Sequence, residues 1–269
     1  MKHTRRILFA LLLGCVAGGS LAAAEKFRSK PPSADDWAAL AKLPDFTGVW
    51  EVGLGGPPRA GDRTAAPAPR RARAPRPQAS LTPEYAAKAK AEAAKAAGAE
   101  SETANCLPPG LPGIMTQPYP MEFLLTPGQV TIVIEAYTQV RHIYTDGRPL
   151  PADPDPSFYG TSVGHWEGDT LVAESVGFEP VPRGLPFPNS DQLKVVERFH
   201  LADPDTMTIE TTIIDPKALT QPFDMGSRTL KRHRNWTIAE YVCEENNRNS
   251  VDSQGKAGIN LANPEAAPR

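Results

Sequence analysis

The sequence predicts an all-β fold, an antiparallel barrel of about ten strands with one surface helix and a disordered insertion rich in Pro, Arg and Ala. From residue 121 onward, short runs rich in Thr, Val and Ile alternate with turn signals such as Pro127-Gly128 and Gly168-Asp169. No helical pattern separates these runs, and their short links favour antiparallel neighbours, as in a barrel or a sandwich. We favour a barrel because closure leaves no strand edge exposed. The predicted strands are 45–52, 121–126, 129–135, 138–145, 161–167, 170–177, 193–201, 206–214, 226–233 and 236–243.

The first 24 residues (1–24) have the pattern of a signal peptide. A basic start precedes the apolar run Ile7–Leu13, and small residues ending at Ala24 form an A-x-A cleavage site. Cleavage after Ala24 predicts a periplasmic or secreted protein. Cys15 offers an alternative lipoprotein site, which fits the apolar stretch less well. The apolar run is too short to span a bilayer and no later segment approaches that length, so we expect no transmembrane segment.

Three segments interrupt or precede the strands. Residues 25–44 predict an N-terminal tether with a short helix. Residues 53–80 carry six arginines among prolines, glycines and alanines, which predicts a flexible, solvated insertion; contact with an anionic surface is the alternative. The clearest helix is 81–98, where Thr82 is the N-cap and Gly98 closes the end. Its faces are mostly Ala and Lys, so we expect it on the surface.

The remaining chain is predicted to be one barrel domain over 45–247 with a disordered tail over 248–269. Cys106 and Cys243 are the two cysteines left after signal removal, and an isolated pair in an oxidising compartment predicts one disulfide. A free, reactive pair is the alternative. The net charge of −2 gives no indication of a nucleic-acid partner, and no feature of the sequence specifies an oligomeric state.

The stretch GHWEGDTLVAES (164–175) concentrates a histidine, a tryptophan and three acids. Its pattern predicts two strands joined by a tight turn at Glu167-Gly168-Asp169. Because neighbouring side chains of a strand point to opposite faces, His165 and Trp166 cannot share one pocket. His165 has no partners at zinc-ligand spacing, so no metal site is predicted here. A catalytic role for His165 remains an alternative.

Two sets of motifs resemble known proteins. The tetrapeptide TGVW, with Gly48 and Trp50, resembles the G-x-W signature of lipocalin-like (calycin) barrels. The resemblance implies that Trp50 packs across one end of the barrel under an arginine from a late strand, and Arg228 and Arg232 are the candidates. The motifs NCLPPG, PYPMEF, IYTDGRP, GHWEGDTLV, VVERF and YVCEENN resemble an uncharacterised family of exported bacterial proteins, over roughly 105–247, and that resemblance implies no activity.

Carboxylates in apolar stripes are the candidates for chemistry. Period two in LKVVERFHL places Glu197 on a face with Leu193, Val195 and Phe199. A carboxyl group facing a barrel interior suits general acid or base work, whereas pairing with an internal arginine is the structural alternative. Glu174 repeats the pattern, since it shares a face with Val172 and Val176.

The paired runs around residues 129–145 supply further candidates. Glu135 ends one strand and Arg141 lies on the next, which predicts either a cross-strand ion pair or a charged group that orients a ligand inside the cavity. His142 and Tyr144 share the face opposite Arg141. Tyr144 lies near a strand end, where it either donates a hydrogen bond to a ligand or forms part of the wall.

Three functions remain open from the sequence. The favoured one is an exported lipocalin-like barrel that binds a small hydrophobic or aromatic molecule, with Glu135, Arg141, His142, Glu174 and Trp50 near the ligand. The alternative is a lyase, isomerase or hydratase without a cofactor, which uses Glu197 as acid or base and Tyr144 or His165 to orient the substrate. The third is a structural or interaction protein with a filled barrel. No motif for a serine hydrolase, a zincin, an NTPase or a c-type cytochrome is present, and none indicates a redox cofactor.

Overall fold

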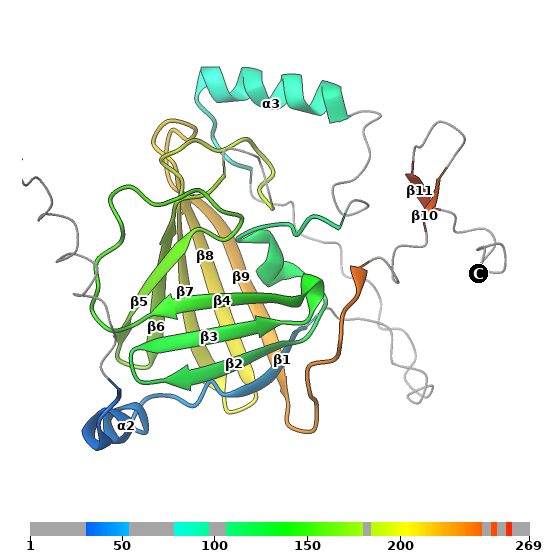
Figure 1. The fold of residues 1–269 in the computed structure, drawn as a ribbon. Helices are drawn as coiled ribbons and strands as arrows, with labels where there is room; N and C mark the ends of the chain where they lie inside the picture. Colours follow the sequence, from blue (N-terminus) through cyan, green and yellow to red (C-terminus); the bar gives the residue numbers. More distant parts are fainter. Residues whose placement is uncertain are drawn as a thin grey trace, which may run out of the picture.

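The computed structural model describes residues 31–53, 78–96, 106–179 and 184–243, together with the backbone of 249–251 and 257–259. Nine strands close into a barrel in the order β1 to β9 (Figure 1). The predicted signal peptide and most of the predicted insertion lie outside the described residues. The barrel strands are β1 (Gly48–Val52), β2 (Met121–Thr126), β3 (Gln129–Ile134), β4 (Gln139–Tyr144), β5 (Thr161–Glu167), β6 (Thr170–Val176), β7 (Lys194–Asp203), β8 (Thr206–Ile214) and β9 (Phe223–His233).

The predicted all-β barrel is therefore confirmed, except that one pair of neighbouring strands is parallel and not antiparallel. Strands β4 and β5 run parallel, with Ile143 opposite Ser162 and Tyr144 opposite Val163. The physical reason is the long connection between Tyr144 and Thr161, because parallel neighbours need a crossover rather than a tight turn. Every other neighbouring pair of the barrel is antiparallel.

Short helices flank the barrel. Helix α2 (Ala34–Leu40) begins at a capping box between Ser33 and Asp36. Helix α3 (Pro83–Ala96) lies above the upper end of the barrel in Figure 1 and buries Tyr85. The 3₁₀ turns η3 (Gly113–Thr116) and η4 (Ala136–Thr138) lie before β2 and between β3 and β4. No helix among the described residues is long and apolar enough to cross a membrane.

The predicted tenth strand at 236–243 is wrong. Residues 236–243, here called the C-terminal strap, run across the turn between β3 and β4 without joining the sheet. The backbone N–H of Ala239 donates to Glu135 Oε2 at 2.9 Å, and Thr138 Oγ1 donates to the carbonyl of Tyr241 at 3.1 Å. Side chains of the turn thus form hydrogen bonds with backbone groups of the strap that a strand would use to pair with its neighbour.

A disulfide holds the end of the strap. Cys243 is bonded to Cys106, which confirms the predicted pair, at a sequence separation of 137. Two further short strands, β10 (Asn249–Val251) and β11 (Ala257–Ile259), pair with each other in the segment predicted to be a disordered tail.

The barrel interior is a packed core at its lower end. Trp50 is fully buried, its Nε1 donates to the carbonyl of Phe46 at 2.9 Å, and the guanidinium carbon of Arg232 lies 4.5 Å from the centroid of the indole. Arg232, rather than Arg228, is therefore the late-strand arginine over Trp50. Phe46 also contacts Trp166, with ring centroids 5.2 Å apart. Trp50 thus belongs to the core and does not line a ligand site as predicted.

Candidate functional site

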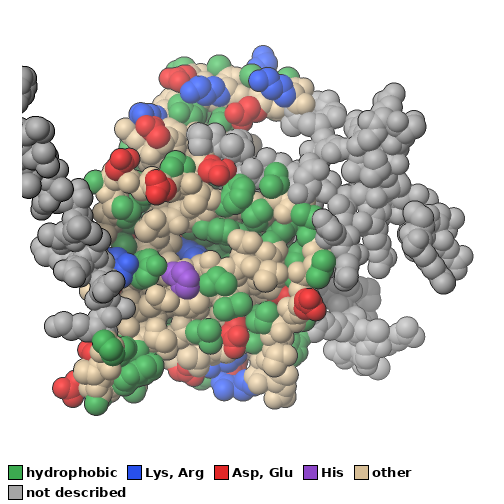
Figure 2. All heavy atoms as spheres, in the orientation of Figure 1, with side chains coloured by type: hydrophobic (Ala, Val, Ile, Leu, Met, Phe, Trp, Pro, Cys, Tyr) green, Lys and Arg blue, Asp and Glu red, His purple; other side chains and the backbone are tan. Residues whose placement is uncertain are grey.

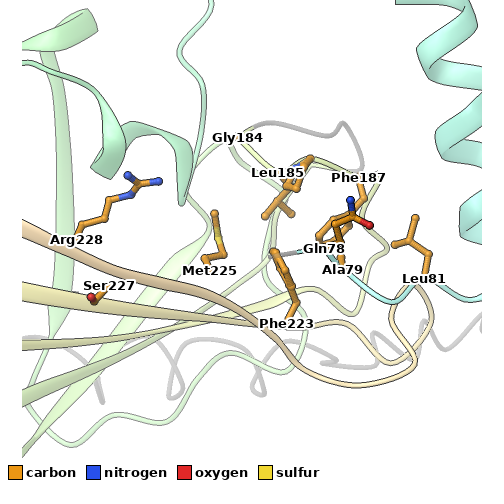
Figure 3. Close-up of a pocket in the computed structure, with 11 residues that line it drawn as sticks. Gln78, Ala79, Leu81, Gly184, Leu185, Phe187, Phe223, Met225, Ser227 and Arg228 are labelled. Carbon is orange, nitrogen blue, oxygen red and sulfur yellow. The ribbon is translucent and has the colours of Figure 1, made fainter. Parts of the chain in front are cut away.

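A pocket of about 810 Å³ lies at the upper end of the barrel, where β9 begins (Figure 3). Its wall combines apolar and aromatic side chains with a few polar groups. The residues that line it are Gln78, Ala79, Leu81, Gly184, Leu185, Pro186, Phe187, Phe223, Met225, Ser227 and Arg228. Its size and composition are those of a site for one small organic molecule.

The pocket is assembled from three segments that lie far apart in the sequence. The segment that leads into α3 is fixed by a bridge between Leu81 and Leu219. The loop at 184–187 packs backbone to backbone against η3, since a Cβ on Gly184 would lie only 2.4 Å from Gly113 Cα. Phe187 from this loop meets Phe223 of β9 edge-on, with ring centroids 5.7 Å apart. The wall is thus built from packed elements on all three sides.

A β-bulge in β9 determines which side chains enter the pocket. The register with β8 shifts between Glu210 and Thr212, and Gly226 has a φ of 80° at the shift. Met225 and Arg228 are three residues apart, so regular alternation would place them on opposite faces of the sheet. The extra residue at the bulge brings both side chains to the same pocket, and Figure 3 shows Arg228 beside Met225 on the barrel side.

A buried ion pair lies deeper in the barrel. Arg141 Nη2 donates to Glu197 Oε2 at 2.5 Å, and the side chains are 2% and 0% exposed. The same nitrogen is 3.3 Å from Ser175 Oγ, and Arg141 Nε donates to Ser162 Oγ at 3.4 Å. This is the structural alternative foreseen for Glu197, whereas the predicted pairing of Arg141 with Glu135 is wrong. Glu135 lies under the strap instead.

Small residues make room for the ion pair. Gly164 and Ala173 lie opposite each other on β5 and β6, and Ala173 is in turn opposite Glu197 on β7. A Cβ on Gly164 would lie 2.8 Å from a methyl group of Ile143. The wall of β5 and β6 is therefore thin where the long side chains of the ion pair cross the interior.

The pair is separated from the pocket by one strand. Glu197 is directly opposite Thr211 on β8, and Thr211 lies at the level of Met225 on β9. Adjacent strands are about 4.8 Å apart, so the backbones of Glu197 and Met225 lie about 10 Å apart around the barrel. None of the eleven residues that line the pocket belongs to the ion pair.

The other two predicted catalytic residues lie outside the barrel. Tyr144 is on the outer face of β4, where the guanidinium carbon of Arg148 lies 3.8 Å from its ring centroid. His165 is 59% exposed on β5 and its Nε2 is 3.1 Å from Glu167 Oε1. Because Glu197 faces inward, the structure does not bring Glu197, Tyr144 and His165 together.

Two predicted ligand-binding residues also face outward. His142 is exposed on β4, with Nδ1 3.1 Å from Gln129 Nε2, on a face where Figure 2 shows hydrophobic side chains and a histidine over β2 to β4. Glu174 forms an ion pair with Lys194 at 2.8 Å on the outer face. The inward residues of β6 are instead Leu171, Ala173 and Ser175.

Tyr144 does line a second hollow, a groove of about 820 Å³ on the outer surface. The groove lies between the start of α2 and the turns that follow β2 and β4. Its lining includes Asp146 and Arg148, which already form an ion pair at 2.6 Å, and otherwise mainly proline, threonine and glycine. The pocket at the barrel end, with Phe187, Phe223 and Met225, is the better site for an apolar molecule.

Sequence reasoning missed the residues of the pocket. The relevant signal was Gly226, because a glycine inside a strand pattern often marks a bulge. The predicted strand began at this glycine, so Phe223 and Met225 were placed outside it. Among the described residues, no group of three or more His, Cys, Asp or Glu side chains is arranged to hold a metal ion. No protein-family model matches the chain, and no curated protein matches it at a significant level.

Proposed function

We propose that this protein is an exported, lipocalin-like barrel that binds a small hydrophobic or aromatic molecule in the pocket at the upper end of the barrel. The observation that carries the proposal is the pocket of about 810 Å³ whose wall includes Phe187, Phe223 and Met225. The disulfide between Cys106 and Cys243 is compatible with export, since such bonds persist in oxidising compartments.

Binding is favoured over catalysis because of where the acid lies. Catalysis by Glu197 requires that its carboxylate reach a substrate, within about 3 Å or through one water. That carboxylate is fully buried and bonded to Arg141, and Glu197 is not among the described residues that line the pocket. Tyr144 and His165 lie on the outer face and therefore give no second group at the same place.

The proposal is tested with N-phenyl-1-naphthylamine, a neutral aromatic dye whose fluorescence rises in apolar surroundings. The purified protein should bind about one dye per chain. Met225→Trp fills the pocket and should weaken the binding at least about tenfold, because the ring occupies the volume of the ligand. Thr229→Trp is the matched control, since it adds the same ring on the exposed outer face of β9 and should leave the affinity within about twofold.

Two results would overturn the proposal. One is no saturable binding of the dye by the folded protein. The other is equal binding by the wild type, Met225→Trp and Thr229→Trp, which would place the dye elsewhere on the surface. Native mass spectrometry of the protein exported from cells complements the dye, since a bound molecule released on denaturation identifies a natural ligand.

A further inference from the structure

We infer that the ligand of this pocket is an organic anion, an apolar or aromatic body with a carboxylate or sulfonate group, and that Arg228 is the residue that selects it. The inference rests on the proposed function, because it assigns the chemical class of the molecule in the same pocket. Among the described residues that line the pocket, Arg228 is the one with a formal charge. An apolar wall with one cation matches a molecule that has one negative group and an apolar remainder.

The strand geometry directs this charge toward the pocket and two nearby acids away from it. Arg228 lies opposite Ile209, on the inward side after the bulge. The nearest acids along β8 and β9, Glu210 and Asp224, are exposed on the outward side. Asp224 is also occupied at the bulge, where its Oδ1 accepts from the backbone N–H of Gly226 at 2.7 Å. These two acids of β8 and β9 therefore point to the opposite face of the sheet from Arg228.

The other inward arginines are used for structure. Arg141 is neutralised by Glu197 at 2.5 Å, and Arg232 bonds to Asp45 at 3.1 Å while it covers Trp50. Arg228 differs because it reaches the pocket. A guanidinium has five N–H donors in a planar fork, so it can keep a contact with the protein and still donate two parallel hydrogen bonds to an acid group.

The partly buried position makes the charge effective. Arg228 is only partly exposed, and Figure 3 shows it beside Met225, on the side away from the loop at 184–187. The attraction between opposite charges increases when water is excluded, and bidentate pairing with an acid group adds to it. An uncharged ligand of the same shape would gain neither contribution, so Arg228 should discriminate between the two classes.

Two dyes with the same ring system separate charge from shape. 1-Anilinonaphthalene-8-sulfonate is N-phenyl-1-naphthylamine with an added sulfonate. Arg228→Gln should weaken binding of the sulfonate dye at least about tenfold and that of the neutral dye by less than about twofold. Arg228→Lys should fall between the wild type and Arg228→Gln for the sulfonate dye, because it keeps the charge without the fork.

Lys231→Gln is the matched control for net charge. Lys231 lies three residues further along β9, on the exposed outer side, so its loss removes the same charge without reaching the pocket. Both dyes should bind this variant as they bind the wild type. Circular dichroism and the melting temperature establish that each variant is folded.

A test on the wild type alone keeps the inference falsifiable if Arg228 variants do not fold. Decanoate should displace the neutral dye at a concentration at least about tenfold lower than 1-decanol, which has the same chain without the charge. Equal displacement, or an equal loss of both dyes in Arg228→Gln, overturns the inference and leaves the proposed pocket intact. Failure of the neutral dye to bind overturns the proposed function itself.

Discussion

Arg141 of β4 and Glu197 of β7 meet inside the barrel, with Nη2 and Oε2 2.5 Å apart. Two other polar atoms of the pair, Arg141 Nη1 and Glu197 Oε1, are buried without a hydrogen-bond partner among the described residues. Moving two charges out of water is costly, and here only one oxygen and one nitrogen regain a strong partner in each other. The pair joins two strands that are not neighbours in the barrel, so it fixes how the walls face each other.

The first prediction concerns the stability of this ion pair. Arg141→Met and Glu197→Leu should each lower the free energy of unfolding by about 3–5 kcal/mol, because each leaves one unpaired charge in the interior. The double variant should lose far less than the sum of the two, since it buries no charge. Urea unfolding of the four proteins measures these values.

The ion pair between Glu174 and Lys194 provides the control. It joins the neighbouring strands β6 and β7 on the outer face, with side chains 34% and 33% exposed. Its removal should cost less than about 1 kcal/mol because water solvates both partners. Similar losses for the buried and the exposed pair would show that burial does not govern the effect.

The second prediction concerns the bulge in β9. Gly226→Ala should destabilise the protein by about 1–2 kcal/mol, because alanine at a φ of 80° is strained although no atom lies within 4 Å of its Cβ. It should also weaken dye binding, since relaxing the bulge turns Met225 or Arg228 out of the pocket. Gly147→Ala is matched, with a φ of 81° and equally open space in a turn outside the pocket, and should reduce stability alone.

The third prediction concerns pH and Asp45. Burial tends to raise the pKa of Asp45, but hydrogen bonds from the side chain and backbone of Thr47 and from Arg232 outweigh it and hold the pKa below its usual value. A lowered pKa in the folded state contributes stability above the unfolded pKa of about 4, and that contribution is lost as the pH falls through the folded pKa.

Asp45→Asn should therefore be less stable than the wild type at pH 7, and the difference should shrink as the pH falls below about 4. Urea midpoints between pH 7 and pH 2 measure it. A difference that stays constant over this range would contradict the assignment to the Asp45 carboxylate. Arg232→Gln combined with Asp45→Asn checks that the effect acts through Arg232.

The fourth prediction concerns the disulfide. Replacing both Cys106 and Cys243 by serine should lower the stability by about 4–5 kcal/mol in the chain-entropy model, because the bond closes a long loop. Urea unfolding under oxidising conditions measures the loss. The reduced wild type should match the double variant, and a reduced wild type as stable as the oxidised one would contradict the prediction.

The fifth prediction concerns the residues on the outer face. Tyr144→Phe and His165→Gln should leave the affinity for N-phenyl-1-naphthylamine within about twofold of the wild type, because neither side chain faces the barrel interior. Fluorescence titration of the two variants measures the affinity. A tenfold loss in either variant would place the dye on the outer surface instead.

The period-two pattern predicted most of the barrel, since it depends on local alternation. It placed Glu197 on one face of its strand with Val195 and Phe199, and it placed Arg141 and His142 on opposite faces of theirs, as observed. The pattern identifies which residues share a face but not which face is inside. In β6 both faces carry apolar residues and Val172 is buried on the outer one, so Glu174 was assigned to the wrong side.

Long-range features were beyond the reach of local patterns. The strap at 236–243 has the composition of a strand, yet its backbone forms hydrogen bonds with the side chains of Glu135 and Thr138 and not with a neighbouring strand. The partner of Arg141 is 56 residues away, on a strand that is not adjacent to β4. The pocket depends on a bulge and on loop packing, which alternation does not encode.

The bond between Cys106 and Cys243 makes a covalent ring that contains β2 to β9, and it leaves β1 as the one barrel strand outside. Strand β1 therefore stays in the barrel through non-covalent contacts. It is hydrogen-bonded to β2 on one side and β9 on the other, and its Trp50 packs beneath Arg232. If the chain were cut between Gly53 and α3, the ring would stay whole and β1 would become a detachable peptide. A synthetic peptide that carries β1 could then replace the natural segment and bring a chosen label into the barrel core.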